Sequence, residues 1–254
     1  MSCPIDQQVV LVTGAGRGLG AAIAEAFARE GASVAINYRN SRDEAEALAD
    51  RLGDKARAFH ADVRDPDAVK RLVGEVTDTL GAPTTAVHNA LADFSFNGDA
   101  RSSLATMQWP EMSAHLETGL KGLLNLIQAV RPSMAEAGFG RIVSIGTNLF
   151  QNPVVPYHDY TAAKASLLSL TRTAAAELGP DGITVNMVSG GLLRTTDASS
   201  ATPEAVFDLI AQNTPLRRVT TPAEAADAVV FFASPWARAV TGQNLIVDGG
   251  LVFG

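Results

Sequence analysis

The sequence predicts an α/β fold in which a doubly wound, seven-stranded parallel sheet carries helices on both faces. Short apolar runs alternate along the chain with longer amphipathic segments, which is the pattern of repeated strand–helix units. The short runs are almost continuously apolar, as expected of parallel strands that are buried on both faces. Because crossovers between parallel strands are right-handed, a doubly wound sheet is the simplest topology.

No internal repeat, low-complexity tract or linker divides the chain, so we expect a single domain over residues 1–254. The strands are predicted at the short apolar runs, which in chain order are 9–13, 33–37, 56–61, 84–88, 141–145, 183–188 and 244–247. The helices are predicted at the amphipathic segments between them, which are 19–30, 42–52, 66–80, 107–130 and 157–178. Gly31 suits the end of the first helix, and Pro66 suits the first turn of the third.

Composition narrows the class of protein. The chain has 254 residues, 46% of them hydrophobic, and a net charge of −7, which argues against a nucleic-acid surface. No apolar run approaches the ~18 residues of a membrane span. Residues 1–8 lack the basic and apolar regions of a signal peptide, and the single cysteine, Cys3, excludes an intrachain disulfide. These features predict a soluble cytoplasmic protein.

A glycine-rich segment joins the first predicted strand to the first predicted helix. It reads Thr-Gly-Ala-Gly-Arg-Gly-Leu-Gly over residues 13–20. Glycines there allow a tight turn and a close approach of the backbone to a pyrophosphate, and the helix N-terminus offers N–H groups and partial positive charge. The alternative is a turn that lets a helix pack closely on a strand. The candidate nucleotide-binding residues are Gly14, Gly16, Arg17, Gly18, Leu19 and Gly20.

Tyr160 and Lys164 stand four positions apart in a predicted helix, so their side chains share one face. A free tyrosine titrates near ~10, and a nearby positive charge favours the phenolate. The pair can therefore act as an acid or base close to neutral pH. The alternative is a packed tyrosine beside a solvated lysine. The glycine segment upstream favours the first interpretation, because a nucleotide site and a proton donor together indicate a reductase.

The spacing of the glycine segment, Thr-Gly-x-x-x-Gly-x-Gly, is typical of a known protein family. From about Gln8 to Gly250 the chain resembles the short-chain dehydrogenase/reductases, and most closely the 3-oxoacyl-acyl-carrier-protein reductase branch. The resemblance implies a Rossmann fold that binds a dinucleotide and carries the catalytic residues. It rests on the order of several short motifs, which are Thr13–Gly20, Asp62-Val63, Asn89-Ala90, Tyr160-x-x-x-Lys164, Val185-Asn186 leading to Gly191 and Thr195, and Val247-Asp248-Gly249-Gly250.

The segment after the second predicted strand bears on the choice of cofactor. Residues 35–40 contain no carboxylate to accept the ribose hydroxyls of NAD, and Arg39 stands where a 2′-phosphate would lie. Arg17 can approach the same phosphate, and guanidinium groups suit phosphate geometry. We therefore expect NADP(H). The alternative is two ordinary surface arginines.

The resemblance assigns further cofactor contacts. It implies that Asp62 and Val63 contact the adenine and that Asn89 contacts the adenosine ribose. The alternative for Asp62 is a turn residue that caps nearby amides. The remaining cofactor-binding residues implied by the family motifs are Ala90, Tyr160, Lys164, Gly191, Leu193 and Thr195.

The resemblance also implies the catalytic roles. Tyr160 would protonate the substrate carbonyl as the hydride arrives, and Lys164 would lower the tyrosine pKa and hold the nicotinamide ribose. The hydroxyl that orients the carbonyl, usually a serine, falls at Thr147. The chain departs from the family at three places: Leu91 and Gly190 replace the usual glycine and proline, and Gly119 replaces the asparagine of the catalytic tetrad. We expect slowed or specialised chemistry.

Three segments are expected to face the substrate: 91–108, 148–158 and 192–215, the last as a helical lid. Phe94, Phe96 and Trp109 suggest an aromatic wall or the packing of an ordinary loop. The two arginines with which carrier-protein reductases dock their acidic partner align with Gly138 and Asp181, and Arg131 and Arg141 are nearby substitutes. A small ketone or aldehyde, or a CoA thioester, is then as well supported as a carrier-bound substrate.

The leading hypothesis is an NADP(H)-dependent reductase of ketones or 3-oxoacyl thioesters with Tyr160 as general acid/base. The competing hypothesis, motivated by Leu91 and Gly119, is a catalytically impaired nucleotide-binding scaffold or sensor. A nucleic-acid regulator ranks third, because the chain lacks a basic cluster. By resemblance the protein would be a homotetramer in which the helices at 107–130 and 157–178 pair across a two-fold axis.

Overall fold

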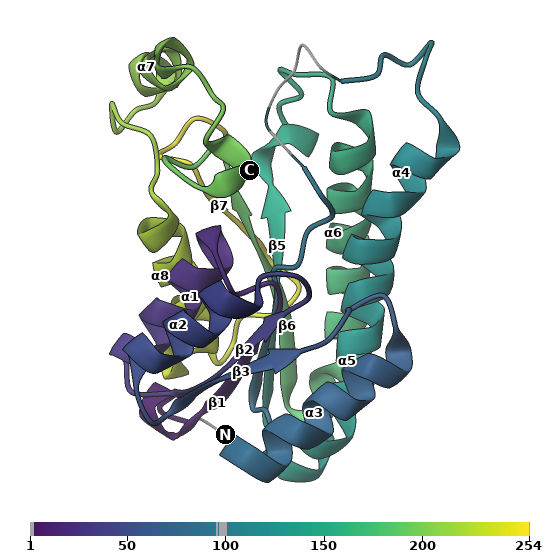
Figure 1. Ribbon diagram of the computed structural model, residues 1–254, viewed down its shortest axis with the longest axis vertical. Helices are drawn as coiled ribbons and strands as arrows, with labels where there is room; N and C mark the ends of the chain where they lie inside the picture. The colour runs from purple at the N-terminus through teal and green to yellow at the C-terminus, as the bar shows by residue number, and fades with distance from the viewer. Residues whose placement is uncertain (1–2, 95, 97–100, 254) are drawn as a thin grey trace.

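The computed structural model describes residues 3–94, 96 and 101–253. The sheet confirms the predicted topology: seven strands, all paired in parallel, lie in the order β3-β2-β1-β4-β5-β6-β7 (Figure 1). The strands are β1 Val9–Val12, β2 Ser33–Tyr38, β3 Ala56–His60, β4 Thr85–His88, β5 Gly140–Thr147, β6 Ile183–Gly190 and β7 Asn244–Val247. Within the described ranges, no helix has both the length and the apolarity to cross a membrane.

Helices cover both faces of the sheet because each buries an apolar stripe against it (Figure 1). One face packs against α1 Gly18–Arg29, α2 Arg42–Leu52 and α8 Pro222–Ala233 through residues such as Phe27, Leu48 and Phe232. The other face packs against α3 Pro66–Leu80, α5 Gly122–Ala137 and α6 His158–Leu178 through Leu72, Leu126 and Leu167. Two apolar cores therefore sandwich the strands.

The strand order reverses between β1 and β4. The chain runs outward from β1 to β3 and then returns to place β4 on the other side of β1. At such a switch point the connections after the two strands separate and leave a crevice at their carboxyl ends. The glycine segment follows β1, and the segment after β4 begins at Asn89, so the predicted nucleotide motifs meet at this crevice.

Two elements differ from the sequence prediction. The helix expected at 107–130 is α4 Trp109–Leu116, a π-helical turn at Glu117–Lys121, and α5. Gly119 lies inside that turn, where apolar spacing alone does not distinguish π from α geometry. The helix α8 was missed, although Thr221 and Glu224 form a capping box that marks its start: Thr221 N donates to Glu224 Oε2 at 2.9 Å.

Candidate active site

The glycine segment after β1 is braced by the end of β4. Asn89 Nδ2 donates to the carbonyl oxygens of Thr13 at 3.1 Å and Gly14 at 3.0 Å. In return, the Thr13 hydroxyl accepts from the backbone N–H groups of Asn89 and Ala90 at 3.0 and 3.1 Å. This reciprocal pairing fixes the turn so that the N-terminus of α1 opens on the crevice, as an anion site requires.

Gly20 allows the closest approach in this region. A Cβ atom there would press into the Gly14 carbonyl oxygen and lie 2.5 Å from Asn89 Nδ2. Gly14 itself has φ +61°, in the left-handed region that favours glycine. These two glycines are therefore required by the backbone, which explains their place in the motif without reference to a ligand. Gly18, Leu19 and Gly20, at the N-terminus of α1, line a cavity.

A cavity of about 800 Å³ joins the predicted nucleotide and catalytic residues. Its lining includes both the glycine segment and the Tyr160–Lys164 pair, which are distant in the sequence. Three predicted residues, Gly16, Thr147 and Thr195, are not among the described lining residues, and Thr195 is exposed. The predicted residues that do line it are Gly14, Arg17, Gly18, Leu19, Gly20, Arg39, Asp62, Val63, Asn89, Ala90, Tyr160, Lys164, Gly191 and Leu193.

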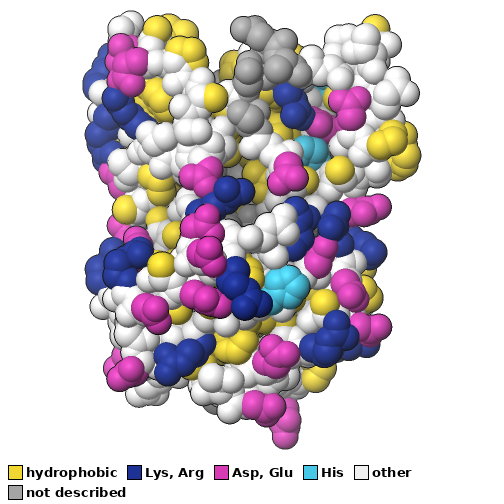
Figure 2. Space-filling model, in the orientation of Figure 1, with side chains coloured by type: hydrophobic (Ala, Val, Ile, Leu, Met, Phe, Trp, Pro, Cys, Tyr) yellow, Lys and Arg dark blue, Asp and Glu magenta, His cyan; other side chains and the backbone are white. Residues whose placement is uncertain are grey.

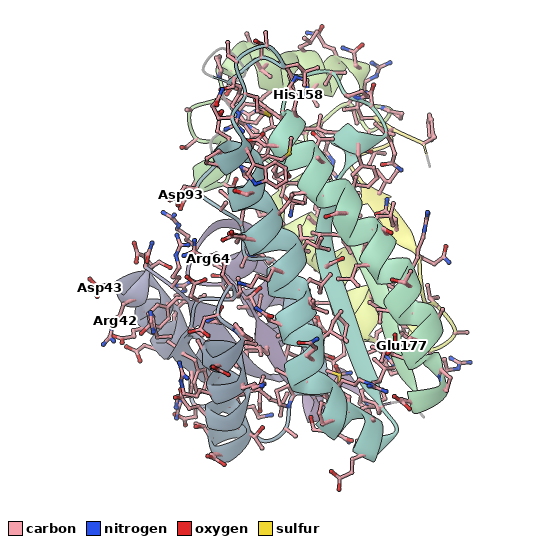
Figure 3. All side chains as sticks on the ribbon, turned by 90° about the vertical axis from the view of Figure 1, so that its right-hand side faces the viewer. Arg42, Asp43, Arg64, Asp93, His158 and Glu177 are labelled. Atoms are coloured by element: carbon pink, nitrogen blue, oxygen red, sulfur yellow. The ribbon has the colours of Figure 1, made fainter. Side chains whose placement is uncertain are left out.

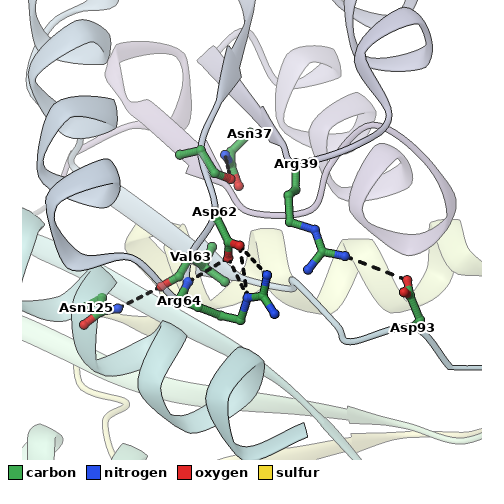
Figure 4. Close-up of polar contacts among 8 residues, drawn as sticks. Asn37, Arg39, Asp62, Val63, Arg64, Asp93 and Asn125 are labelled. Atoms are coloured by element: carbon green, nitrogen blue, oxygen red, sulfur yellow. Dashed lines mark hydrogen bonds and ion pairs between the residues drawn. The ribbon is translucent and has the colours of Figure 1, made fainter. Parts of the chain in front are cut away.

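Asp62 is held by its neighbour Arg64 at one side of this cavity (Figure 4). Arg64 Nε donates to both carboxylate oxygens at 3.0 Å, and the Arg64 backbone N–H donates to Oδ1 at 3.0 Å. The Arg64 side chain lowers the pKa of Asp62, so the carboxylate is charged at neutral pH. Asp62 thus caps a nearby amide, as the alternative interpretation expected, and also faces the cavity.

Arg39 and Arg17 have only weakly held partners. Arg39 lies 3.9 Å from Asp93, whose side chain is 92% exposed (Figure 4). Arg17 pairs at 3.2 Å with Asp197, and both side chains are more than half exposed. Exposed pairs of this kind contribute little stability, so an incoming phosphate can replace either carboxylate at small cost. Both guanidinium groups line the cavity.

Tyr160 and Thr147 lie together where β5 ends and α6 begins. Their side chains are hydrogen-bonded to each other, and both are almost fully buried. The Thr147 oxygen also accepts from the Leu149 backbone N–H at 3.3 Å, so its own O–H remains available as a donor. Burial raises the pKa of Tyr160 to about 12, and the hydrogen bond with Thr147 opposes this rise. Tyr160 therefore holds its proton at neutral pH.

Lys164 is buried beside this pair, and its ammonium donates to the Ile145 carbonyl oxygen at 2.6 Å. Burial lowers the pKa of Lys164 to about 8. The expectation that Lys164 lowers the Tyr160 pKa is not met here, because the ammonium nitrogen is directed to Ile145 and lies 5.7 Å from the centre of the Tyr160 ring. Desolvation outweighs the charge at that distance.

Because the Lys164 pKa is lowered in the folded protein, the free energy of unfolding should depend on pH. The unfolded chain, with a lysine pKa of about 10.4, binds more protons than the folded protein between pH 8 and 10, so Lys164 becomes less destabilising as the pH rises. Relative to Lys164→Met, the unfolding free energy of the wild type should rise by about 2 kcal/mol over that interval. Urea titrations of both proteins at pH 8 and 10 measure the change; a constant difference contradicts it.

Aromatic side chains enclose Tyr160. The Phe94 ring stacks on the Tyr160 ring at 4.5 Å with an angle of 18°, and Phe96 meets Tyr160 nearly edge-on at 5.9 Å. Tyr157 contacts Phe94 edge-on at 5.2 Å. The predicted aromatic wall is thus present at Phe94 and Phe96, but Trp109 is 70% exposed and takes no part in it. His158 lies at the start of α6, and Glu177 lies near the end of the same helix (Figure 3). His158 does not line the main cavity.

A buried ionic cluster beside Tyr160 was missed by sequence reasoning. Asp159 is 3% exposed, accepts from the Tyr160 backbone N–H at 2.8 Å and pairs with Arg101. His115 Nε2 lies 3.6 Å from the same carboxylate. Arg101 lowers the pKa of Asp159 against the effect of burial. A carboxylate directly before the Tyr-x-x-x-Lys motif was the available signal, but its partners are distant in sequence.

The substrate-facing segments also contact one another. The Phe96 backbone N–H donates to the Ala198 carbonyl oxygen at 2.9 Å, which joins the segment after β4 to the predicted lid. Within the lid, α7 Glu204–Asn213 buries Phe207, and the Arg194 guanidinium lies 5.3 Å from the Phe207 ring centre. Leu193 and Ala198 line the cavity, and Asp197 between them pairs with Arg17, so this segment borders the cavity.

Comparison with known proteins identifies the family. The family described as enoyl-(acyl carrier protein) reductase matches residues 14–252. The chain belongs to the short-chain dehydrogenase/reductase family. Among solved structures, it superposes with a TM-score of 0.87 on a blue fluorescent protein from a metagenomic library in complex with NADPH, which is 33% identical, over 99% of this chain and 100% of that one.

Curated members of the family are similar over nearly their whole length. The chain is 36% identical over 245 residues to the 3-oxoacyl-[acyl-carrier-protein] reductase FabG of Staphylococcus epidermidis, covering 95% of this chain and 97% of the relative. It is 35% identical over 248 residues to the FabG of Vibrio cholerae, covering 97% and 98%. It is 35% identical over 253 residues to nodulation protein G of Azospirillum brasilense, covering 98% and 100%.

The residues that depart from the short-chain dehydrogenase/reductase pattern lie around the cavity. Leu91 lines it and is 38% exposed, so its bulk is not buried elsewhere. Gly119 has no atom within 4 Å of an added Cβ, which leaves open space where the family has a side chain. Gly190 and Gly191 also line the cavity, next to β6. The retained hydroxyl, phenol and ammonium thus sit in an altered pocket.

Neither predicted substitute for the docking arginines of carrier-protein reductases is a free surface cation. Arg141 is 2% exposed, with its guanidinium 4.1 Å from the Phe139 ring centre, so it cannot bind a partner protein. Arg131 is exposed and pairs at 3.3 Å with Asp181, a carboxylate that an acidic partner would have to displace. On the face seen in Figure 2, basic side chains are interspersed with acidic ones. The case for a carrier-protein substrate is weakened accordingly.

Proposed function

We propose that this chain is an NADP(H)-dependent reductase that transfers a hydride to a ketone or 3-oxoacyl substrate. The observation that carries the proposal is the single cavity that contains both the braced glycine segment and the Tyr160–Lys164 pair, with Thr147 hydrogen-bonded to Tyr160. A nucleotide held on the glycine segment and extended along this cavity reaches the proton donor. The NADPH-bound blue fluorescent protein of similar fold supports the choice of cofactor.

The cavity fits NADP(H) in three respects. The first turn of α1 borders the cavity through Gly18, Leu19 and Gly20, so its N-terminus can receive a pyrophosphate. Arg39 and Arg17 have weakly held carboxylate partners that a 2′-phosphate can replace. Asn37, near the end of β2, directs its amide to the Ala61 carbonyl oxygen at 3.2 Å, and residues 35–40 contain no carboxylate.

The residues of the site divide the chemistry between them. NADPH, when bound, supplies the hydride that reaches the carbonyl carbon. Tyr160 donates its proton to the carbonyl oxygen, for which it must be protonated, as its raised pKa ensures. The family resemblance gives the Thr147 O–H the role of orienting the same oxygen, for which it would turn from its hydrogen bond with Tyr160 toward the substrate. Lys164 lines the same cavity and, by the family resemblance, holds the nicotinamide ribose; its ammonium is bonded to the Ile145 carbonyl oxygen and does not lower the Tyr160 pKa.

Arg39→Ala tests the cofactor assignment. We expect KM for NADPH to rise about tenfold and KM for NADH to change less than twofold, because a guanidinium–phosphate contact is lost that NADH does not make. Arg42→Ala is the matched control: Arg42 is an exposed arginine three residues on, pairs with Glu46 at 3.8 Å, and is not among the described residues that line the cavity. Equal effects on both cofactors would contradict the assignment.

The reductase proposal is tested with a panel of activated ketones, aldehydes and 3-oxoacyl thioesters at fixed NADPH. NADPH oxidation with at least one substrate class supports it. The competing function, a nucleotide-binding scaffold with impaired catalysis, rests on Leu91 and Gly119 and predicts NADPH binding without oxidation by any member of the panel. Including both an acyl-CoA and the same acyl group on a carrier protein separates the two thioester classes.

We further propose a single catalytic domain with a lid at 192–215, a cytoplasmic location, and a homotetramer. For the last, the helices α4–α5 and α6 leave apolar residues available for a partner: Leu124 is 42% exposed, and Leu116, Leu120 and Leu170 are half-buried. Leu123 and Leu167, by contrast, belong to the core. Light scattering measures the assembly directly, and a monomer at micromolar concentration would contradict it.

A further inference from the structure

The end of the cavity that contains Tyr160 has a different character from the end that contains the glycine segment. Around Tyr160 the lining is apolar, with Leu91, Phe94, Phe96, Ile145 and Leu193. Apart from Lys164, the charged residues among the described lining are Arg17, Arg39, Glu44, Asp62, Asp93 and Asp197, which belong to the nucleotide end and the lid. Within the described lining, a substrate group next to the reacting carbonyl therefore meets mainly apolar surface.

This apolar surface is held in place by the buried ionic cluster. The Arg101 guanidinium carbon lies 4.7 Å from the centre of the Phe94 ring, within range of a cation–π interaction. Arg101 in turn donates to Asp159 at 2.6 Å, and Asp159 is anchored by the Tyr160 backbone N–H at 2.8 Å. The proton donor and the ring that stacks on it are thus tied to the same carboxylate.

Phe94 is fixed on its other sides by rings at steep angles. Phe96 meets it at 4.9 Å and 85°, Tyr157 at 5.2 Å and 84°, and His115 at 5.5 Å and 83°. Edge-to-face contacts of this kind favour one orientation of the central ring. Phe94 is only half-buried and borders the cavity, so this orientation presents part of the ring to a bound substrate.

We propose that Phe94, positioned by Arg101 and Asp159, determines substrate specificity and selects uncharged ketones that carry an aromatic ring next to the carbonyl. A flat ring attached to the carbonyl carbon extends from the Tyr160 hydroxyl along the Phe94 and Phe96 rings, where it gains offset or edge-to-face contacts. A puckered ring of the same carbon count cannot make those contacts. This inference rests on the proposed reductase function and adds its substrate class.

The test compares phenyl methyl ketone with cyclohexyl methyl ketone, which have the same number of carbons. The measured quantity is the ratio of their kcat/KM values in each variant relative to the wild type, since this removes their different intrinsic reactivities. Phe94→Leu should lower the phenyl-to-cyclohexyl ratio about tenfold. Phe253→Leu, a matched change at a residue that is 83% exposed, should leave the ratio within twofold.

Arg101→Met tests the positioning role. It should lower the same ratio severalfold, whatever its effect on the overall rate, while KM for NADPH stays within twofold. A general loss of structure would lower activity on both ketones together, without a change in their ratio. A phenyl-to-cyclohexyl ratio that is unchanged in Phe94→Leu overturns the proposal, even if both ketones are reduced.

A binding measurement keeps this inference separate from the reductase proposal. If the wild type reduces no ketone at all, the reductase proposal fails, and calorimetric titration of the NADPH-loaded protein with the two ketones decides the inference. Tighter binding of phenyl methyl ketone that is lost in Phe94→Leu supports it, and equal binding of the two ketones by the wild type overturns it.

Discussion

Replacing Tyr160 by phenylalanine is expected to lower kcat by about 10³-fold and to leave the affinity for NADPH within twofold of the wild type. The substitution removes one oxygen atom and keeps the ring that stacks on Phe94 at 4.5 Å, so the pocket retains its shape. What is lost is the proton donor, whose pKa of about 12 keeps it protonated throughout the neutral range. Steady-state kinetics and NADPH titration measure the two quantities.

Tyr38→Phe serves as the control for this substitution. Tyr38 is also buried, at the end of β2, but it packs in the core against α2 and does not line the cavity. Its loss of a hydroxyl should leave kcat within twofold. A Tyr160→Phe protein that retains more than a tenth of the wild-type kcat would show that the phenol is not the proton donor.

Replacing Gly20 by alanine is expected to destabilise the protein by about 1–3 kcal/mol and to lower NADPH affinity at least tenfold. The new Cβ would press into the Gly14 carbonyl and lie 2.5 Å from Asn89 Nδ2 and 2.9 Å from Ala15 Cα. The Asn89 amide must then give up its bonds to Thr13 and Gly14, which hold the turn. Urea unfolding and NADPH titration measure the two effects.

Gly74→Ala is the matched control for that prediction. Gly74 lies in the interior of α3, is exposed, and has no atom within 4 Å of an added Cβ. Alanine there should stabilise the protein by about 0.5–1 kcal/mol through helix propensity and leave NADPH affinity unchanged. We expect the free energy of unfolding to fall in Gly20→Ala and to rise in Gly74→Ala. A Gly20→Ala protein of wild-type stability would show that the close packing around Gly20 does not exclude a Cβ atom.

The sheet was predictable because its signal is local. Each strand is an apolar run of a few residues, and a doubly wound parallel sheet is the simplest topology once the alternation with helices is seen. The π-helical turn around Gly119 was not predictable, since its apolar spacing resembles that of a continuous helix. The missed helix α8 had a local signal in Thr221 and Glu224, a capping box in sequence.

Part of the candidate site could also be predicted from local motifs, and part of it could not. The glycine segment and the Tyr160–Lys164 pair are short motifs, and the structure brings them to one cavity. In the buried ionic cluster, Asp159 contacts His115 and also Arg101, which is 58 residues away in the sequence. No local sequence pattern reveals contacts between residues so far apart. The raised pKa of Tyr160 was likewise hidden, because it depends on burial in the folded protein rather than on the spacing of Tyr160 and Lys164.

The central claim, hydride transfer from NADPH to a carbonyl carbon, is tested most directly by isotope transfer. The protein is incubated with a ketone that it consumes and with NADPH carrying deuterium at the transferable position of the nicotinamide ring. We expect an alcohol with one deuterium on the carbinol carbon, formed in equal amount to the NADP⁺. An alcohol without deuterium, or NADPH that binds but is not oxidised with any ketone of the panel, would contradict it.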